Sequence, residues 1–175
     1  EHFSSGGDIK GFLEASPEAV SNLAWNIAAP ARCGKPVVVA NRGYCFGVGF
    51  EISLACDFRI ASETALYALP EQKLAQIPGS GGCARLQKMV GITRTKDIVM
   101  RSRRIPAQQA YDWGVVTECV PDAELERPAR DRARAGRGAP GEAGVSVPSA
   151  LRTACRAGPA SCWTTMQASI AAYRA

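Results

Sequence analysis

Short apolar runs that break into glycine-rich loops and then into helices recur along residues 1–126, and this repeat limits the possible folds more than any other feature. Residues 35–40 form a β-branched run of the kind found in a strand buried on both faces. A glycine-rich loop follows this run, and a helix is expected to begin near Glu51. Because strand, loop and helix alternate, the pattern predicts an α/β fold.

Other elements follow from periodicity and helix-boundary signals. Ser16 and Pro17 resemble a helix start, with a serine cap and a proline at the first helical position. The apolar residues after them have the i, i+3, i+4, i+7 spacing of an amphipathic helix: Val20, Leu23, Ala24 and Ile27. Two further short strands are expected at residues 58–60 and 66–69, and a helix at residues 84–90 that is closed by Gly91.

Composition limits the class of protein. The chain has 175 residues, of which 46% are hydrophobic and 21% charged, as expected for one soluble globular domain. No apolar run approaches the roughly 18 to 20 residues needed to cross a bilayer, so neither a membrane anchor nor a signal peptide is expected. Seven cysteines without C-x-x-C spacing indicate neither a disulfide framework nor a zinc site. We therefore expect a reduced, cytoplasmic location.

The composition changes after Glu126. Residues 127–175 include 13 Ala, 8 Arg, 5 Gly and 4 Pro, and we find no apolar periodicity that could form a buried face. A basic arm for nucleic acid is one interpretation, although nucleic acid is the least favoured partner. Disorder is another. We favour a third, translation of a GC-rich gene in a shifted frame, and therefore divide the chain into a folded part, 1–126, and an Arg/Ala/Gly/Pro-rich tail, 127–175.

Residues 44–51 place flexible backbone between a buried strand and a helix. The first N–H groups of a helix have no partner within it, and the helix dipole is positive there, so this junction can hold a developing oxyanion. The same glycines could instead serve close packing or bind a phosphate, and Glu51 could be only a favourable partner of the helix dipole. Local sequence leaves these alternatives open.

Glu71 follows Pro70 in an otherwise apolar context, twenty residues after Glu51. A carboxyl group in a partly apolar site favours its neutral form and can act as acid and base near neutral pH, so two such groups could handle one water molecule. The alternative for Glu71 is an exposed turn residue. Residues 3–10 form a third segment, a strand end that breaks into glycines, and its alternative is an ordinary loop.

Taken in order, these segments resemble the enoyl-CoA hydratase/isomerase (crotonase) superfamily over about residues 3–126. Residues 5–10 are similar to its G-A/G-D-I/L-K segment, and residues 35–43 to its K-P strand, with Arg42 inserted in the place of an Asn-Gly pair. Residues 47–57 are similar to the G-G-G-x-E-L-x-x-x-C-D segment. Residues 69–71 match the position of the second glutamate, residues 77–86 match I-P-G-x-G-G-x-x-R-L, and residues 104–116 resemble the next helix and strand.

The resemblance implies an α/β fold of the crotonase-like (ClpP/crotonase) ββα superhelix type and an acyl-CoA thioester substrate. It assigns catalysis to Glu51 and Glu71, and the oxyanion hole to the N–H groups of Gly7 and Val48. The residues it places at the substrate or coenzyme A are Ser5, Gly6, Asp8, Ile9, Gly47 and Gly79. Coenzyme A is part of the substrate, so neither a separate cofactor nor a metal is expected.

The resemblance also implies a reaction. Two glutamates favour an enoyl-CoA hydratase, a lyase that adds water across the 2,3-double bond; the alternatives are an isomerase or ring hydrolase of the same superfamily. The family domain begins with further elements ahead of the segment at residues 5–10, so we expect a fold that is incomplete at the N-terminus and aberrant at the C-terminus. A complete fold would form a homotrimer or a dimer of trimers, whereas an inactive truncated remnant is the non-enzymatic alternative.

Overall fold

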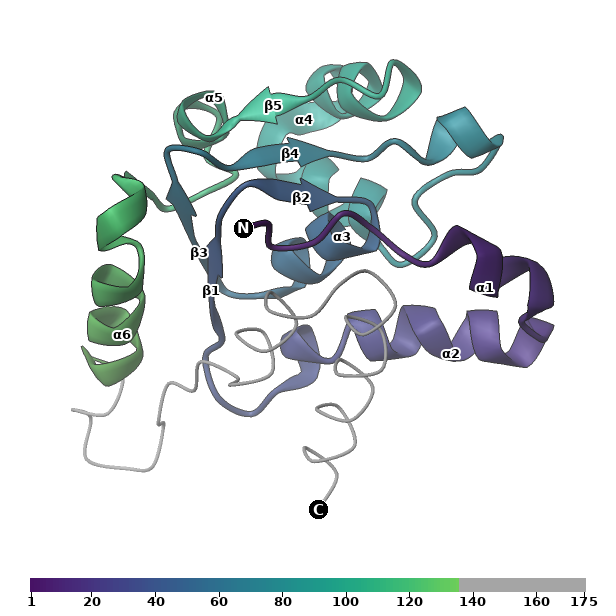
Figure 1. Cartoon of the computed structure of the whole chain (residues 1–175), viewed down its shortest axis with the longest axis horizontal. Helices are drawn as coiled ribbons and strands as arrows, with labels where there is room; N and C mark the ends of the chain where they lie inside the picture. Colours follow the sequence, from purple (N-terminus) through teal and green to yellow (C-terminus); the bar gives the residue numbers. More distant parts are fainter. Residues whose placement is uncertain (136–175) are drawn as a thin grey trace.

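The computed structural model describes residues 1–135, which form two small sheets surrounded by helices (Figure 1). The first sheet has the strand order β1-β3-β6 and the second the order β2-β4-β5. The helices are α1 (Ile9–Glu14), α2 (Pro17–Ile27), η1 (Pro30–Arg32), α3 (Val48–Ala55), η2 (Glu71–Leu74), α4 (Gly82–Met100), α5 (Ala107–Asp112), η3 (Asp122–Glu124) and α6 (Glu126–Ala135). The strands are β1 (Val38–Asn41), β2 (Tyr44–Phe46), β3 (Phe58–Ser62), β4 (Leu66–Ala68), β5 (Ile105–Pro106) and β6 (Glu118–Val120).

The first sheet is parallel throughout. Val38 of β1 lies opposite Phe58 of β3, and Ile60 of β3 lies opposite Glu118 of β6. Val38 is 0% exposed, and the valines on either side of it are 1% exposed. The prediction of a strand buried on both faces is therefore confirmed: Val38 packs against α6, and Val39 belongs to the main core. In the second sheet, β2 and β4 are parallel and β5 pairs with β4 in the antiparallel direction.

Helix α2 has the predicted start. The side chain of Ser16 accepts a hydrogen bond from the N–H of Ala19 at 3.2 Å, and Pro17 is the first helical residue. Leu23 and Ile27 are buried and pack against Ile52 of α3, which confirms these two positions of the amphipathic pattern, whereas Val20 is 44% exposed. Serine caps of this kind contribute about 1 kcal/mol to helix stability.

Helix α4 extends further than the sequence predicted. Gly91 has φ +78° and ψ 167°, so the regular helix does stop there, as expected. The chain then resumes a helical path to Met100, and Ile98 and Val99 of this second segment are buried in the main core. Burial of these apolar side chains stabilises the helical segment after Gly91, although the glycine alone predicts that the helix ends there.

A helix also forms where we expected no apolar face. In α6, Ala129 and Ala133 are buried together with the preceding Leu125, and they pack against Val38 and Ile60 of the first sheet (Figure 1). The expectation that residues 127–135 have no apolar face is therefore wrong. A spacing of four residues forms a narrow stripe, and short alanines between arginines conceal it in the sequence. Residues 136–175 of the predicted tail lie outside the described residues.

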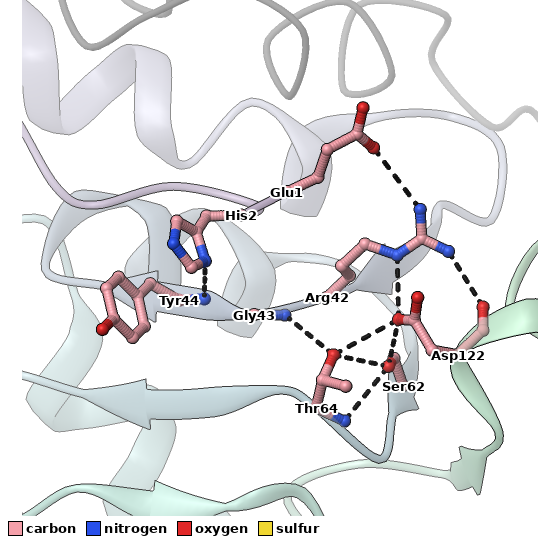
Figure 2. A network of polar contacts seen from close by, with 8 residues as sticks. All are labelled: Glu1, His2, Arg42, Gly43, Tyr44, Ser62, Thr64 and Asp122. Carbon is pink, nitrogen blue, oxygen red and sulfur yellow. Dashed lines mark hydrogen bonds and ion pairs between the residues drawn. The ribbon is translucent and has the colours of Figure 1, made fainter.

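Asp122 connects the end of β6 to the turns that follow β1 and β3. Its Oδ1 accepts hydrogen bonds from Arg42 Nε at 2.9 Å, Ser62 Oγ at 2.5 Å and Thr64 Oγ1 at 3.2 Å (Figure 2). Arg42 Nη2 also donates to the carbonyl oxygen of Asp122 at 2.9 Å. Arg42, which departs from the family pattern, therefore fixes the start of the loop into β2.

Replacement of Asp122 by asparagine should lower stability by about 1 kcal/mol at pH 7, because an ion pair with a partly exposed carboxylate contributes little more. The hydrogen bond from Ser62 and the bonds from Arg42 hold the pKa of Asp122 below its usual value. This stabilisation is present above the unfolded-state pKa and is lost as pH falls through the folded-state pKa. Urea unfolding of both proteins at pH 7 and near pH 2.5 should show a difference that shrinks in acid; a constant difference would contradict the assignment.

Candidate active site

Glu51 is buried inside the protein and held by backbone donors. It lies in the first turn of α3 and is 1% exposed. Its Oε1 accepts hydrogen bonds from the N–H of Ser80 at 2.8 Å and from the N–H of Gly82 at 2.9 Å. Burial raises the pKa of this carboxyl group, and the two backbone donors act in the opposite direction. The group is thus fixed in position and can change its protonation state closer to neutral pH than a surface glutamate can.

Glu71 begins η2 and is half-buried, and the Oε2 atom of its carboxyl group is buried although the residue stands at a turn. Within residues 1–135, its Oε2 has no hydrogen-bond partner. Burial, and to a smaller extent the charge of Glu51, raise the pKa of Glu71 to about 7. The alternative of an exposed turn residue is therefore excluded, and the site contains two electrostatically coupled carboxyl groups.

The loop between β2 and α3 presents backbone N–H groups. Gly47 has φ +52° and ψ −127°, a conformation that strongly favours glycine, and the helix begins at the next residue, Val48. Among residues 1–135, only Ala75 and Ser102 have positive φ without being glycine, so Val48 occupies its position without this kind of backbone strain. The N–H groups of Gly7 and Val48 make no hydrogen bond within the described part of the chain. Two donors are therefore free for a ligand oxygen.

Distances show that the predicted residues converge. A Cβ atom placed on Gly7 would lie 3.7 Å from Val48 Cγ2, so the two donor residues are neighbours. A Cβ atom placed on Gly47 would lie 3.1 Å from Glu71 Oε1 and 3.7 Å from Gly6 Cα. Glu71 therefore lies beside the loop that ends at Val48. The structure brings together segments from the chain start, the start of α3 and η2.

A model of the enoyl-CoA hydratase/isomerase family matches residues 1–160. The chain belongs to this family. The match extends beyond the residues 3–126 over which the motifs resemble the family, and it includes part of the tail that we assigned to a shifted frame.

The curated relatives include carnitinyl-CoA dehydratases. That of Shigella flexneri is 40% identical over 135 residues, which are 75% of this chain and 52% of the relative. That of Salmonella typhimurium is 46% identical over 100 residues, which are 57% of this chain and 38% of the relative. The chain thus spans about half the length, or less, of these relatives.

Solved structures establish the crotonase fold. The enoyl-CoA hydratase of Bacillus anthracis matches with a TM-score of 0.67 and 30% identity, over 93% of this chain and 64% of that one. The enoyl-CoA hydratase of Polaromonas sp. JS666 matches with a TM-score of 0.65 and 26% identity, over 71% of this chain and 50% of that one. The α/β fold expected from the motifs is therefore confirmed.

The other residues that the family resemblance placed at the substrate lie near the same loops. Ser5, Asp8 and Gly79 are exposed, and Ile9 is 53% exposed. Asp8 Oδ1 accepts a hydrogen bond from the N–H of Lys10 at 3.1 Å and so caps α1. Roles for these residues, and for Gly6 and Gly47, in binding coenzyme A or the acyl group stay predictions.

The sequence did not indicate which groups would hold Glu51. Ser80 and Gly82 supply the donors, and a Cβ atom placed on Gly82 would lie 2.8 Å from Glu51 Oε1. The run of small residues just before a helix could have indicated these donors, because the first N–H groups of a helix have no partner within it. Ser4 was missed as well: its Oγ accepts a hydrogen bond from the N–H of Gly6 at 3.2 Å and shapes the turn before Gly7.

Within residues 1–135, no three His, Cys, Asp or Glu side chains are grouped so that they could hold a metal ion. No helix of this same part of the chain is both long and apolar enough to span a membrane. The arrangement of two carboxyl groups beside two free N–H groups suits proton transfer next to a carbonyl that gains negative charge.

Proposed function

We propose that this chain carries the active site of an enoyl-CoA hydratase-type lyase, which adds water across the 2,3-double bond of an enoyl-CoA thioester. One observation carries the proposal: the free N–H groups of Gly7 and Val48 are neighbours, and the coupled carboxyl groups of Glu51 and Glu71 lie around them. A carbonyl oxygen that becomes enolate-like needs such donors, and a water molecule that is split between two carbons needs such carboxyl groups.

In the proposed reaction, the thioester oxygen accepts hydrogen bonds from Gly7 and Val48. Glu51 removes a proton from water as the oxygen attacks Cβ, and electrons move through the double bond onto the thioester oxygen. Glu71 then delivers a proton to Cα as the carbonyl reforms. A pKa of about 7 lets Glu71 hold that proton at neutral pH and release it again. Proton exchange between the two carboxyl groups and water restores the starting state.

The names of the relatives narrow the choice of substrate. Dehydration is hydration in reverse, so a carnitinyl-CoA dehydratase catalyses the same class of reaction. We propose carnitinyl-CoA and its dehydrated product as the first substrate pair to test, and crotonyl-CoA as a general substrate.

We also propose that the whole protein works in the cytoplasm and, like enzymes with a complete family fold, as a trimer or a dimer of trimers.

Hydration can be measured as loss of enoyl-thioester absorbance after the chain is added to crotonyl-CoA. Product analysis by mass spectrometry separates a hydrated product from an isomer or a ring-opened product. The double variant E51Q/E71Q is the control. A rate equal in the variant and the wild type would sink the proposal, and so would thermal unfolding whose midpoint does not rise with added coenzyme A thioester.

A further inference from the structure

The turn at residues 79–82, which holds Glu51, is itself held from its other side. Glu51 Oε1 accepts from the N–H groups of Ser80 and Gly82 at 2.8 Å and 2.9 Å. Arg85 Nη1 donates to the carbonyl oxygen of Ser80 at 2.8 Å. A carboxyl group and a guanidinium group therefore bind the same turn, and no hydrogen bond joins these two side chains directly within residues 1–135.

The three hydrogen bonds engage three successive peptide groups. The N–H of Ser80 belongs to the peptide that joins it to Gly79, and the N–H of Gly82 belongs to the peptide after Gly81. The Ser80 carbonyl belongs to the peptide between these two, which Arg85 holds. A peptide group is planar, so fixing the middle one limits how far the two outer donors can rotate. Arg85 thereby sets the direction of both donors to Glu51.

The guanidinium group of Arg85 packs closely against the turn. Gly81 has φ +90°, and a Cβ atom placed on it would lie 2.5 Å from Arg85 Nη1 and 3.1 Å from Arg85 Cζ. The guanidinium group therefore lies directly against the α-carbon of Gly81. The N–H of Arg85 also donates to the carbonyl oxygen of Gly81 at 3.0 Å, so backbone and side chain of one residue bind the turn.

Helix stability does not explain a cation at this position. Arg85 is the fourth residue of α4, which begins at Gly82, and the positive end of the helix dipole disfavours positive charge in the first turn. The other cation nearby on the same helix, Lys88, is exposed and lies one turn further from that end. The position of Arg85 is thus explained by what its guanidinium group binds.

We propose that Arg85 is a positioning residue that holds the Ser80–Gly82 backbone donors against Glu51 and so keeps this carboxyl group aligned for its reaction. The proposal rests on the proposed function for its effect on rate, because misalignment of a catalytic group by about 1 Å can cost on the order of a hundredfold. Its effect on Glu51 itself requires only the folded chain.

The test compares R85M, R85K and the matched control K88M. With crotonyl-CoA, R85M should lower kcat at least tenfold with KM changed less than threefold, R85K should recover part of kcat, and K88M should match the wild type. Titration of the Glu51 carboxyl carbon by NMR should show a higher pKa in R85M, because looser donors and the loss of a nearby positive charge both favour the protonated form.

Two results would overturn the proposal. One is R85M with a lower melting temperature but an unchanged Glu51 titration, which is the pattern of a purely structural residue. The other is R85M and K88M that behave alike in both assays. A wild-type chain that titrates as expected but turns over no thioester would count against the proposed function alone, since the NMR measurement needs no substrate.

Discussion

Replacement of Glu71 by glutamine is expected to lower kcat by about 10²- to 10⁴-fold, the range that a positioned general acid or base contributes. Glutamine has nearly the same shape as glutamate, so the loop beside Gly47 should keep its geometry. The amide cannot take up or deliver a proton near pH 7. The rate of crotonyl-CoA hydration measures the loss, and E63Q, which changes an exposed glutamate, is the control. A decrease of less than tenfold would contradict the role given to Glu71.

The same substitution should not weaken the fold in neutral or basic solution. The pKa of Glu71 is raised from 4.5 to about 7 in the folded chain, so the folded state binds more protons than the unfolded state between these values. The free energy of unfolding therefore falls as pH rises through this window. Glutamine does not ionise, and at pH 8 the variant should be more stable by on the order of 2 kcal/mol, less than the full pKa shift implies because solvent screens the partly exposed carboxylate. Urea unfolding of the wild type and E71Q at pH 5 and pH 8 measures the difference in their free energies of unfolding at each pH.

E71Q is thus expected to lower kcat and to raise stability at pH 8. This combination would show that Glu71 serves the reaction and not the stability of the fold. A buried carboxyl oxygen without a partner costs free energy, and such a cost persists where chemistry requires it.

Glu51→Gln is expected to reduce kcat as much as Glu71→Gln does. The amide oxygen can still accept the hydrogen bonds from Ser80 and Gly82, but the amide is unable to accept a proton from water.

Local patterns predicted the elements whose ends are marked by specific residues. The start of α2 was readable from Ser16 and Pro17, and β1 from three successive valines, because caps and buried strands leave short signals. The second half of α4 and the whole of α6 were not readable. Both are held by packing against residues distant in sequence, and such contacts leave no local mark.

In the candidate site, too, some features could be predicted from the sequence and others depend on contacts between distant residues. The resemblance to the family identified Glu51 and Glu71, and the structure places both beside one loop. Local sequence alone could not show that the two residues lie together. Glu71 lies beside Gly47, more than twenty residues away, and its raised pKa comes first from burial, which leaves no local sequence signal. Arg85 could be found only from its contact with Ser80, since an arginine in a helix is ordinarily a surface residue.

Replacement of Val48 by proline should remove one oxyanion donor and leave the helix intact. Val48 is the first residue of α3, where an N–H group has no partner within the helix and proline is well tolerated. Gly47 before it has φ +52° and ψ −127°, the mirror image of the extended conformation that usually precedes proline, and glycine adopts both forms. Backbone geometry therefore permits the substitution.

The expected result is a kcat lower by about 10²- to 10³-fold, the cost of losing one donor to a developing oxyanion. V48A is the matched control, since it keeps the N–H while it removes side-chain contacts with the cluster of Leu23, Ile27 and Ile52. Circular dichroism should show equal helix content in both variants. If V48P and V48A hydrate crotonyl-CoA at rates within threefold of each other, the charge that develops on the thioester oxygen is not stabilised by this N–H, and the oxyanion hole must be sought elsewhere.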